Sequence, residues 1–334
     1  MRHPSATAAL LAAAVLGGLG LVPAAAHART GPEVARAAWI TSCYDKKERD
    51  FAPCGRWRLL WRDGRQTTIR DAAITKIDSA GKETRDPSTF AISGDGKVLA
   101  YERAGDHRLV VRRAAGGPAT VLPKSVRPKG LGTDVIGLDL SSTGDKVLID
   151  YQDDPARLPA KVVTVATGKI TTLPAEDTVL GFSGDGDEVL ATRLQGDNTT
   201  TMYAYRLDGG APIKSTPPQV VANALAYALA PDGKTVAVFT EGDTAKKRPP
   251  RARIYDLETG DLSAAADLPV KADALPYAPW WTADGRLNVV VHSGDERETA
   301  VIRVLTVDPQ SQQTTQADKY TISKTRHAYF AAGE

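Results

Sequence analysis

Few residues in this sequence have the types and spacing that catalysis or metal binding requires. Three histidines follow residue 28, namely His107, His292 and His327. They lie much further apart than the ligands of a zinc motif, and neither an H-E-x-x-H sequence nor a cysteine–histidine cluster is present. The sequence therefore predicts no metal and no other cofactor.

Aromatic side chains near residue 280 are the first candidates for a binding site. Tyr277, Trp280 and Trp281 occur within five residues, and His292 ends the apolar run that follows them. On a strand, Trp280 and Trp281 would point to opposite faces, so one would be buried and the other could reach a surface. Exposed aromatic rings are typical ligand anchors, although packing in the core is the ordinary fate of such residues.

A basic segment at residues 246–253, KKRPPRAR, is the second candidate. Its cations include Lys246, Lys247, Arg248 and Arg251, and two prolines separate them into two groups. Such a loop could bind an anionic cell-wall polymer or an acidic protein surface. A solvated loop without a partner is the alternative interpretation.

The only two cysteines, Cys43 and Cys54, follow a segment that resembles an export signal. Residues 1–28 contain Arg2, an apolar stretch rich in alanine and leucine, and an A-x-A cleavage sequence at residues 26–28. In an oxidising compartment two thiols favour one disulfide, which would add about 2–3 kcal/mol of stability. We therefore expect a bacterial protein that is secreted or associated with the cell wall. It would have no stable membrane insertion after cleavage, and a retained membrane anchor is the alternative.

Charge and length restrict the class of protein further. The chain has 334 residues, with 42 basic and 40 acidic side chains and a formal net charge of +2. This balance does not favour a nucleic-acid-binding surface. The length suits two average domains or one large β domain, and no linker rich in serine, glycine or proline divides it. We expect one domain and a monomer.

A repeat organises the chain from about residue 87 to residue 317. Each unit has an apolar run, a turn and a second apolar run, as in ALAPDGKTVAVFTEG at Ala228–Gly242. Asp-Gly between apolar runs is a strong hairpin signal, because glycine adopts positive φ freely. The turns are 41 to 52 residues apart and contain Asp95, Gly144, Asp185, Asp232 and Asp284.

Each hairpin is followed by a further strand, a turn and a more polar strand, which gives four strands per unit. Periods of about 40–50 residues with four strands predict the blades of a β-propeller. We expect an all-β, six-bladed propeller at residues 39–334 after a flexible N-terminal segment at 29–38, with seven blades as the alternative. An open ring would leave unpaired strand edges, so strands near 39–69 and a last strand at 319–330 should share a blade.

The repeats resemble those of the TolB family of WD40-like β-propellers. The correspondence is strongest at Ala230–Lys234, APDGK, and at Tyr255–Gly260, YDLETG. It is weaker in the third unit, where Gly144-Asp145 replaces Asp-Gly. The resemblance implies a six-bladed propeller and a protein-binding role. The N-terminal α/β domain of the TolB protein itself is absent, so that protein's outer-membrane partner is not expected here.

The sequence therefore favours an exported propeller that binds a protein or a cell-wall polymer, or acts as a scaffold, at or outside the cell surface. We expect its contact face to carry segment 246–253, with Trp280 or Trp281 near the mouth of the central channel. A flat face with a basic or aromatic patch would support this hypothesis.

An enzyme, a hydrolase or a lyase, is the alternative, because propeller active sites draw their residues from separate blades and leave no linear motif. The candidate residues are Asp134, Asp139 and His292. Carboxylates that converge in a deep pocket at the channel mouth would favour the enzyme.

Overall fold

The repeated Asp-Gly sequences form tight turns, as the pattern predicts. In the unit at residues 230–234, Gly233 has a φ of +69°, and the backbone N–H of Lys234 donates to Asp232 Oδ1 at 3.0 Å. In the unit that departs from the pattern, Gly144 has a φ of +74° and keeps the glycine's place in the turn. The left-handed conformation needed at this position explains why glycine recurs there.

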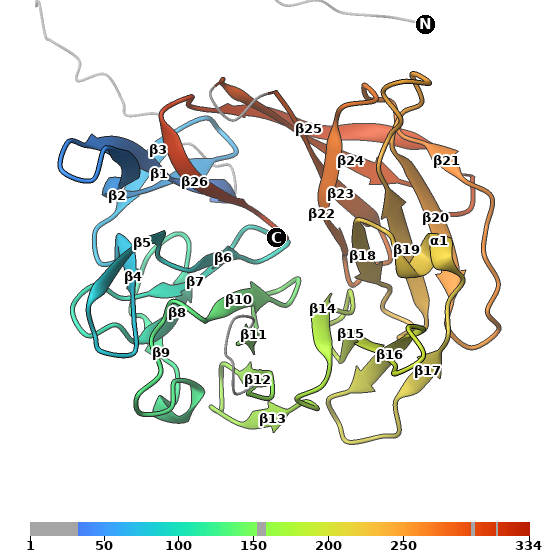
Figure 1. Cartoon of the computed structure of the whole chain (residues 1–334), viewed down its shortest axis with the longest axis horizontal. Coiled ribbons are helices and arrows are strands. Elements are labelled where there is room, and N and C mark those ends of the chain that lie inside the picture. The colour runs from blue at the N-terminus through green and yellow to red at the C-terminus, as the bar shows by residue number, and fades with distance from the viewer. Residues whose placement is uncertain (1–32, 152–157, 295–297, 312) are drawn as a thin grey trace, which may run out of the picture. The chain divides into compact units, whose positions relative to one another are not determined.

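The computed structural model describes residues 33–151, 158–294, 298–311 and 313–334, and all structural statements below concern these residues. The part of the chain from residue 33 onward forms six four-stranded antiparallel sheets around a central opening (Figure 1). Six blades, rather than seven, are therefore present. The predicted signal peptide, 1–28, lies outside the described residues.

Blade 1 combines strands from both ends of this region, and blades 2 and 3 are built from consecutive strands. Blade 1 consists of β26 (Arg326–Ala331), β1 (Ala35–Asp45), β2 (Asp50–Trp61) and β3 (Gln66–Ile69). Blade 2 consists of β6 (Phe90–Ile92), β7 (Val98–Glu102), β8 (Leu109–Arg113) and β9 (Thr120–Val121). Blade 3 consists of β10 (Gly137–Leu140), β11 (Lys146–Asp150), β12 (Lys161–Thr164) and β13 (Ile170–Thr172).

The other three blades follow in chain order. Blade 4 consists of β14 (Thr178–Phe182), β15 (Glu188–Leu194), β16 (Thr200–Arg206) and β17 (Ile213–Ser215). Blade 5 consists of β18 (Ala226–Leu229), β19 (Thr235–Thr240), β20 (Arg251–Asp256) and β21 (Ala266–Asp267). Blade 6 consists of β22 (Leu275–Trp281), β23 (Leu287–Ser293), β24 (Ala300–Val307) and β25 (Thr314–Ile322).

Short elements connect some of the blades. A two-stranded hairpin of β4 (Thr75–Ile77) and β5 (Glu83–Pro87) lies between blades 1 and 2 in the chain. A short 3₁₀ helix, η1 (Lys124–Val126), precedes blade 3, and one helical turn, α1 (Gln219–Ala222), precedes blade 5. The segment at 71–87, which the repeat does not explain, is therefore an insertion into a connection.

The ring closes by pairing the two ends of the described region, as predicted. Strand β26 pairs antiparallel with β1, with Ala37 opposite Ala331 and Ile40 opposite Ala328. An ion pair at 2.7 Å between Arg36 Nε and Asp318 Oδ2 joins β1 to the outer strand β25 of blade 6. Closure leaves no inner strand of the ring without a partner, so the aggregation risk of an open edge is removed.

Two predicted boundaries near the closure are wrong. Strand β1 begins at Ala35, so four residues assigned to a flexible segment belong to the sheet, where Ala37 is fully buried. The expected single strand at 319–330 is two strands, because β25 ends at Ile322 and β26 begins at Arg326. The turn between them is stabilised by the N–H of Arg326, which donates to the carbonyl of Ser323 at 3.1 Å. The polar run at 323–327 contains neither glycine nor proline, so no turn residue marked the break in the sequence.

The core lies between neighbouring blades. In β2, Trp57, Leu59 and Trp61 are buried, while Arg56 and Arg58 between them are exposed, as the period of two predicts. Trp57 is fully buried between blades 1 and 2, and its indole Nε1 donates to the carbonyl of Ala73 at 2.8 Å. Each blade therefore stabilises the next one around the ring.

The propeller has two distinct faces. Inner strands β6, β10, β14, β18 and β22 each run into one of the repeated tight turns, and the parallel bridges Ile92–Ala332 and Ser183–Leu229 show that neighbouring inner strands run the same way. We call the face with these turns the turn face. The opposite face, called the loop face, carries the connections from second to third strands and from one blade to the next.

Candidate functional site

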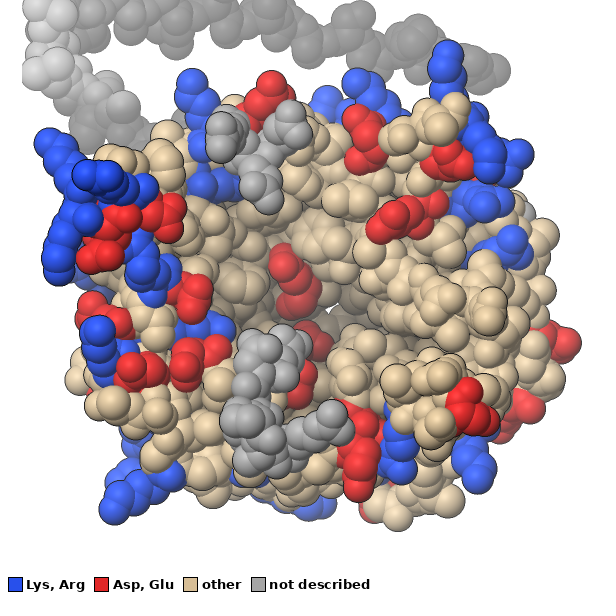
Figure 2. Space-filling model, viewed as in Figure 1, with Lys and Arg blue, Asp and Glu red and all other residues tan. Residues whose placement is uncertain are grey.

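A cavity of about 300 Å³ lies at the axis of the propeller, among the inner strands β14, β18 and β22. Its polar and aromatic lining consists of Asp139, Ser142, Phe182, Ser183, Tyr227, Tyr277, Trp280, Trp281 and Glu334. A neighbouring cavity of about 220 Å³ shares Asp139 and Glu334 and adds Asp150. Figure 2 shows acidic side chains inside the central opening, whereas most basic side chains lie at the periphery.

Two carboxyl groups meet in the axial cavity without a basic partner. Burial raises the pKa of Asp139 to about 7, offset in part by the backbone N–H of Leu140. Burial also raises the pKa of Glu334 to about 7; the N–H of Ala331, which donates to Glu334 Oε2 at 2.7 Å, lowers it, and the charge of Asp139 raises it. No lysine, arginine or histidine of the described chain lines either cavity.

Trp280 forms a wall of the cavity and is held between two glycines. A Cβ atom on Gly94 would lie 2.7 Å from Cδ1 of the indole, and one on Gly333 would lie 2.6 Å from Cδ2. Any larger residue at either position would therefore displace the ring. The indole Nε1 is shielded from solvent and has no hydrogen-bond partner within the described residues.

Two tyrosines complete the aromatic part of the lining. Tyr277 lies edge-on to Tyr329 with ring centroids 6.3 Å apart, and its Oη is shielded from solvent without a hydrogen-bond partner in the described part of the chain. The hydroxyl of Tyr227 donates to the carbonyl of Val221 at 2.7 Å. Burial raises the pKa of both phenols, so both stay neutral at ordinary pH.

Trp281 lies on the other face of β22, as expected for neighbouring strand residues. It is 5% exposed and packs in the core between blades 5 and 6. Its Nε1 donates to the carbonyl of Ala228 at 3.2 Å. Although one edge of it borders the axial cavity, its main role is structural.

Of the three candidate catalytic residues, only Asp139 lines the axial cavity. His292 lies on β23 opposite Leu275, and its ring is 6.0 Å from that of Tyr329. Burial and, to a lesser extent, the charge of Arg326 lower the pKa of His292. Asp134 precedes β10, where its backbone N–H donates to the carbonyl of Ile77 at 3.1 Å. The structure does not bring these three side chains together.

The position of Asp139 within the repeat indicates its place at the axial cavity. In four of the five aligned units, the residue two positions before the turn serine or its equivalent lines the axial cavity, and in the other unit it is buried in the core. The occupants are Ala91, Asp139, Gly181, Ala228 and Trp280. Asp139 is the one carboxylate at this position, where three of the other units have alanine or glycine. It is therefore the unit's signal for a polar group at the axis. Glu334 follows the last strand and has no counterpart in the repeat.

The basic segment and the tryptophans lie at opposite ends of the propeller. Exposed Lys246, Lys247 and Arg248 belong to the connection between β19 and β20, on the loop face, and Lys246 Nζ pairs with Asp243 at 3.2 Å. Half-buried Arg251 begins β20. Trp280 and Trp281 end β22, next to the turn face. The expected single face with both features does not form, because β22 crosses the ring from one face to the other.

Exposed apolar side chains gather on the loop face, which the sequence analysis did not foresee. Seven large hydrophobic residues of the described chain are exposed: Tyr44, Phe51, Ile74, Leu194, Val220, Leu225 and Leu275. Each lies at the loop-face end of a strand or in a connection between blades. None of the described residues of this kind lies in a turn of the opposite face.

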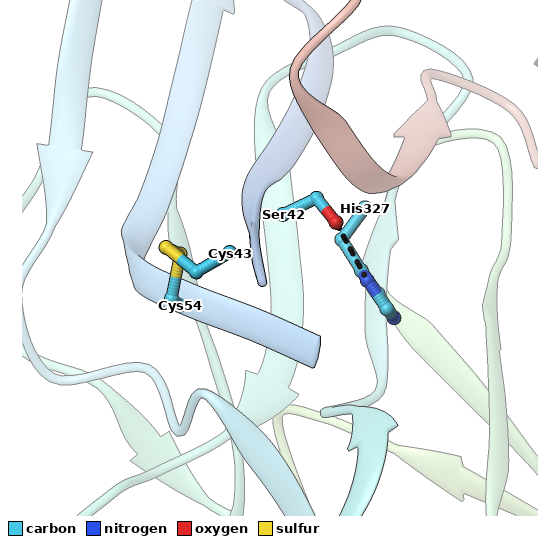
Figure 3. The surroundings of a disulfide bond; sticks show 4 residues. All are labelled: Ser42, Cys43, Cys54 and His327. Atoms are coloured by element: carbon cyan, nitrogen blue, oxygen red, sulfur yellow. Dashed lines mark hydrogen bonds between the residues drawn. A yellow bond between two sulfur atoms is a disulfide. The ribbon is translucent and has the colours of Figure 1, made fainter. Parts of the chain in front are cut away.

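The tip of the β1–β2 hairpin has the most prominent of these side chains after Leu194. Tyr44 and Phe51 are 54% and 58% exposed, and their rings meet edge-on with centroids 5.3 Å apart. The predicted disulfide between Cys43 and Cys54 is present, with Cα atoms 5.8 Å apart, and it joins the two strands just behind the rings (Figure 3). The hairpin tip, residues 43–54, is thus covalently braced.

Neighbouring groups add to the order of this hairpin. The Ser42 hydroxyl lies 3.4 Å from Nδ1 of His327 on β26, as Figure 3 shows. Arg85 of β5 forms ion pairs with both ends of the turn: its Nη1 lies 3.4 Å from Asp45 Oδ2, and its Nη2 lies 3.8 Å from Asp50 Oδ2. These contacts hold the base of the hairpin, and the rings of Tyr44 and Phe51 project from its tip.

The described residues contain neither a metal-binding cluster nor a membrane-spanning helix. Within the described ranges, no group of three or more histidine, cysteine, aspartate or glutamate side chains could hold a metal ion. No helix in the same ranges is long and apolar enough to cross a membrane.

Known proteins resemble this chain in fold. No protein-family model matches the sequence, and a search among curated proteins gave no match. Among solved structures, the chain is similar to a TolB protein assigned to Agrobacterium tumefaciens, with 14% identity, coverage of 87% of this chain and 91% of that one, and a TM-score of 0.47.

Two further solved structures share the architecture. One is the propeller domain of the Trilobed protease of Pyrococcus furiosus, with 11% identity, coverage of 86% and 94%, and a TM-score of 0.47. The other is from the nidogen–laminin complex, with 10% identity, coverage of 89% and 98%, and a TM-score of 0.48. At these identities and TM-scores the likenesses indicate no function, and the six-bladed architecture rests on the strand pairing described above.

Proposed function

We propose that this chain is an exported protein-binding module and that the loop face is its contact surface. The observation that carries the proposal is the exposure of all seven large apolar side chains on this one face. Scattered exposed hydrophobic residues are ordinary on a protein surface, but their restriction to one face is typical of a contact surface.

The hairpin tip supports a docking role. Tyrosine and phenylalanine offer large contact areas with few rotatable bonds, so little conformational entropy is lost when they bind. The Cys43–Cys54 disulfide and the edge-on contact of the rings reduce that loss further. A disulfide also indicates a location outside the cytoplasm, which supports the export that the N-terminal segment predicts.

The charges on the loop face suggest the chemistry of the partner. Exposed Lys246, Lys247 and Arg248 occupy the β19–β20 connection, whereas the cations of the hairpin turn are balanced by acidic residues of the same turn, as in the pair of Lys47 with Glu48. A protein with an apolar patch bordered by acidic residues would match both features. An anionic cell-wall polymer would use the cations and leave the apolar side chains without a role.

The test is affinity capture of surface and secreted proteins on the immobilised full chain. Each retained protein is then purified and titrated against three chains: wild type, the double variant Tyr44→Ser/Phe51→Ser and the turn-face control Arg286→Ala. We expect the double variant to weaken binding about tenfold or more, because buried aromatic anchors contribute most to such interfaces. The control should bind as the wild type does.

Three results would contradict the proposal. One is that no protein is retained. Another is that the double variant and the control bind a retained protein equally well. The third is retention of an anionic polymer that depends on Lys246, Lys247 and Arg248 but not on the aromatic pair, which would favour a wall-binding function.

Catalysis at the axis is the second candidate function. It is favoured by the converging carboxyl groups of Asp139 and Glu334, whose pKa values of about 7 suit proton transfer near neutral pH. Its test is a panel of chromogenic glycosides, esters and peptides. Turnover that is lost in both Asp139→Asn and Glu334→Gln would support an enzyme, and an inactive wild type would argue against one.

A further inference from the structure

Within the described residues, no positive charge balances the carboxyl groups of the axial cavity. Asp139 and Glu334 line it, and neither forms an ion pair with any described residue. The cavity wall contains no basic side chain of the described chain. Buried carboxylates are costly unless a cation compensates them, and since the described lining supplies none, a cationic ligand would be favoured at this position.

The rest of the lining is aromatic and rigid. Trp280 packs so closely against Gly94 and Gly333 that a Cβ atom on either would lie within 2.7 Å of the ring, and the Tyr227 hydroxyl is held by its hydrogen bond to the carbonyl of Val221. The faces of such rings attract cations, most strongly when water is excluded. Aromatic walls with nearby carboxylates are the usual composition of sites for ammonium groups.

From this arrangement we propose that the axial cavity binds a small organic cation, whose ammonium group lies between the carboxyl groups of Asp139 and Glu334 and against the ring of Trp280. A volume of about 300 Å³ limits the ligand to the smallest class of metabolite-sized molecules. The proposal goes beyond the protein-binding function, because the site and the ligand differ from those of the loop face.

An organic cation suits the lining better than a metal ion does. Calcium takes six to eight oxygen ligands and magnesium prefers six, whereas two carboxyl groups dominate the polar wall of this cavity. The described residues form no group of three or more possible ligands that could hold a metal. Aromatic surface is of no use to a hard metal ion, but it stabilises an alkylammonium group.

Tyr277 suggests a second feature of the ligand. Its Oη belongs to the wall of the cavity and is shielded from solvent, and a polar neighbour there, the hydroxyl of Tyr329, interacts with it without a well-formed hydrogen bond. A buried hydroxyl without a partner is unfavourable, and a ligand oxygen could accept its hydrogen bond. We therefore infer an ammonium compound that also has a hydroxyl or carbonyl oxygen.

Binding should depend on pH with a defined sign. An ammonium ligand favours the ionised carboxyl groups, so it must displace the protons that Asp139 and Glu334 hold below a pH of about 7. The other titratable groups that face the two cavities are the neutral phenols of Tyr227 and Tyr277 and the carboxyl group of Asp150. Affinity should therefore rise as the pH rises from 6 to 8.

Calorimetric titration of the full chain with four probes tests the proposal. Choline and ethanolamine supply quaternary and primary ammonium groups with a hydroxyl, 3,3-dimethyl-1-butanol is the neutral isostere of choline, and calcium chloride supplies a metal ion. We expect at least one of the two ammonium probes to bind, more tightly at pH 8 than at pH 6. Neither the neutral isostere nor calcium should bind.

The variants separate the charges of the site from general effects on the fold. Asp139→Asn and Glu334→Gln keep the shape of each side chain and remove its charge, so each should weaken ammonium binding about tenfold or more. Glu83→Gln, an exposed residue of β5, is the control and should bind as the wild type does. Thermal unfolding of each variant confirms that it is folded.

Four results would overturn the proposal: no binding of either ammonium probe, equal binding of the neutral isostere, binding of calcium that the two variants abolish, and unchanged ammonium affinity in both variants. None of them bears on the capture experiment at the loop face. Failure of the cation site and failure of the protein-binding function are therefore distinguishable.

Discussion

At the axis, two carboxyl groups are enclosed by aromatic rings without a basic neighbour, whereas at the hairpin tip two aromatic rings stand in solvent among paired charges. Asp139 and Glu334 represent the first environment, and Tyr44 and Phe51 the second. Around the rings, Asp45 and Asp50 pair with Arg85. The same residue types are thus arranged in opposite ways in the two regions.

The difference teaches what each region lacks. At the axis, the carboxyl groups of Asp139 and Glu334 have no basic partner among the described residues. The cavity is small, so the positive charge that would balance them must come from a small cation. The hairpin tip has compensated charge and uncovered apolar area, so only another surface can supply what is missing there. One propeller can therefore offer two sites of different scale, and the following variants test whether they are independent.

The largest expected effect concerns the brace of the hairpin. Cys43→Ser/Cys54→Ser removes a disulfide between residues separated by 11 positions and should lower the free energy of unfolding by about 2–3 kcal/mol. Urea unfolding of the full chain measures the loss. Binding of cations at the axis should not change, and a parallel loss of both would show that the two regions are coupled.

The second effect concerns the stability cost of the axial charge. Asp139 has a pKa of about 7 in the folded protein against an ordinary value of 3.8, so the unfolded chain releases this proton first as the pH rises. The contribution of the protonated Asp139 carboxyl group to the free energy of unfolding is therefore fully present below a pH of about 4. It is lost as the pH rises from there through 7. Asp139→Asn should therefore gain stability relative to the wild type between pH 4 and pH 8, with no advantage at pH 4.

Urea unfolding of Asp139→Asn and the wild type at these two pH values checks the sign. If the difference in the free energy of unfolding between Asp139→Asn and the wild type were the same at pH 4 and pH 8, burial of the ionised Asp139 carboxyl group would have no stability cost. In that case the argument for a missing cation would lose its physical basis.

The third effect concerns the shape of the aromatic wall. Gly94→Ala places a methyl group against the Trp280 indole and should cost about 1–2 kcal/mol through overpacking. Because the ring must shift, ammonium affinity should fall although both carboxyl groups remain. Gly105→Ala is the control, since a Cβ there meets no atom within 4 Å. Calorimetry and urea unfolding of both variants give the comparison.

The smallest expected effect concerns the exposed rings. Tyr44→Ser/Phe51→Ser should change the free energy of unfolding by no more than about 0.5 kcal/mol, since both side chains are more than half exposed. Thermal unfolding measures it. A loss of several kcal/mol would show that the two rings stabilise the fold, and their exposure would then not indicate a docking role.

Most of the fold was predictable because its signals are local. The turn at Asp232-Gly233 and its four counterparts specify hairpins within about 15 residues, and regular spacing specifies blades. Closure through β1 and β26 followed from the need to pair strand edges. The boundary at Ala35 was missed because the start of β1 lies outside the recognisable repeat, and the one at 323–325 because its polar residues include neither glycine nor proline.

The sites were less predictable because they depend on distant parts of the chain. Asp139 was among the candidates, but its neighbour Glu334 lies far along the sequence, and nothing in the repeat connects the two. His292 and Asp134 looked equally suitable and lie elsewhere. The loop-face patch is invisible in the sequence, because residues such as Leu194 and Val220 read as ordinary strand or loop positions until the faces are known.

Hydrogen exchange of the full chain, alone and with a captured partner protein, tests the central claim of a loop-face docking surface most directly. The account predicts slower exchange in the hairpin tip at 43–54 and in the 241–250 connection, with unchanged exchange in the turns at 93–97 and 282–286. Protection confined to the turn face would contradict it.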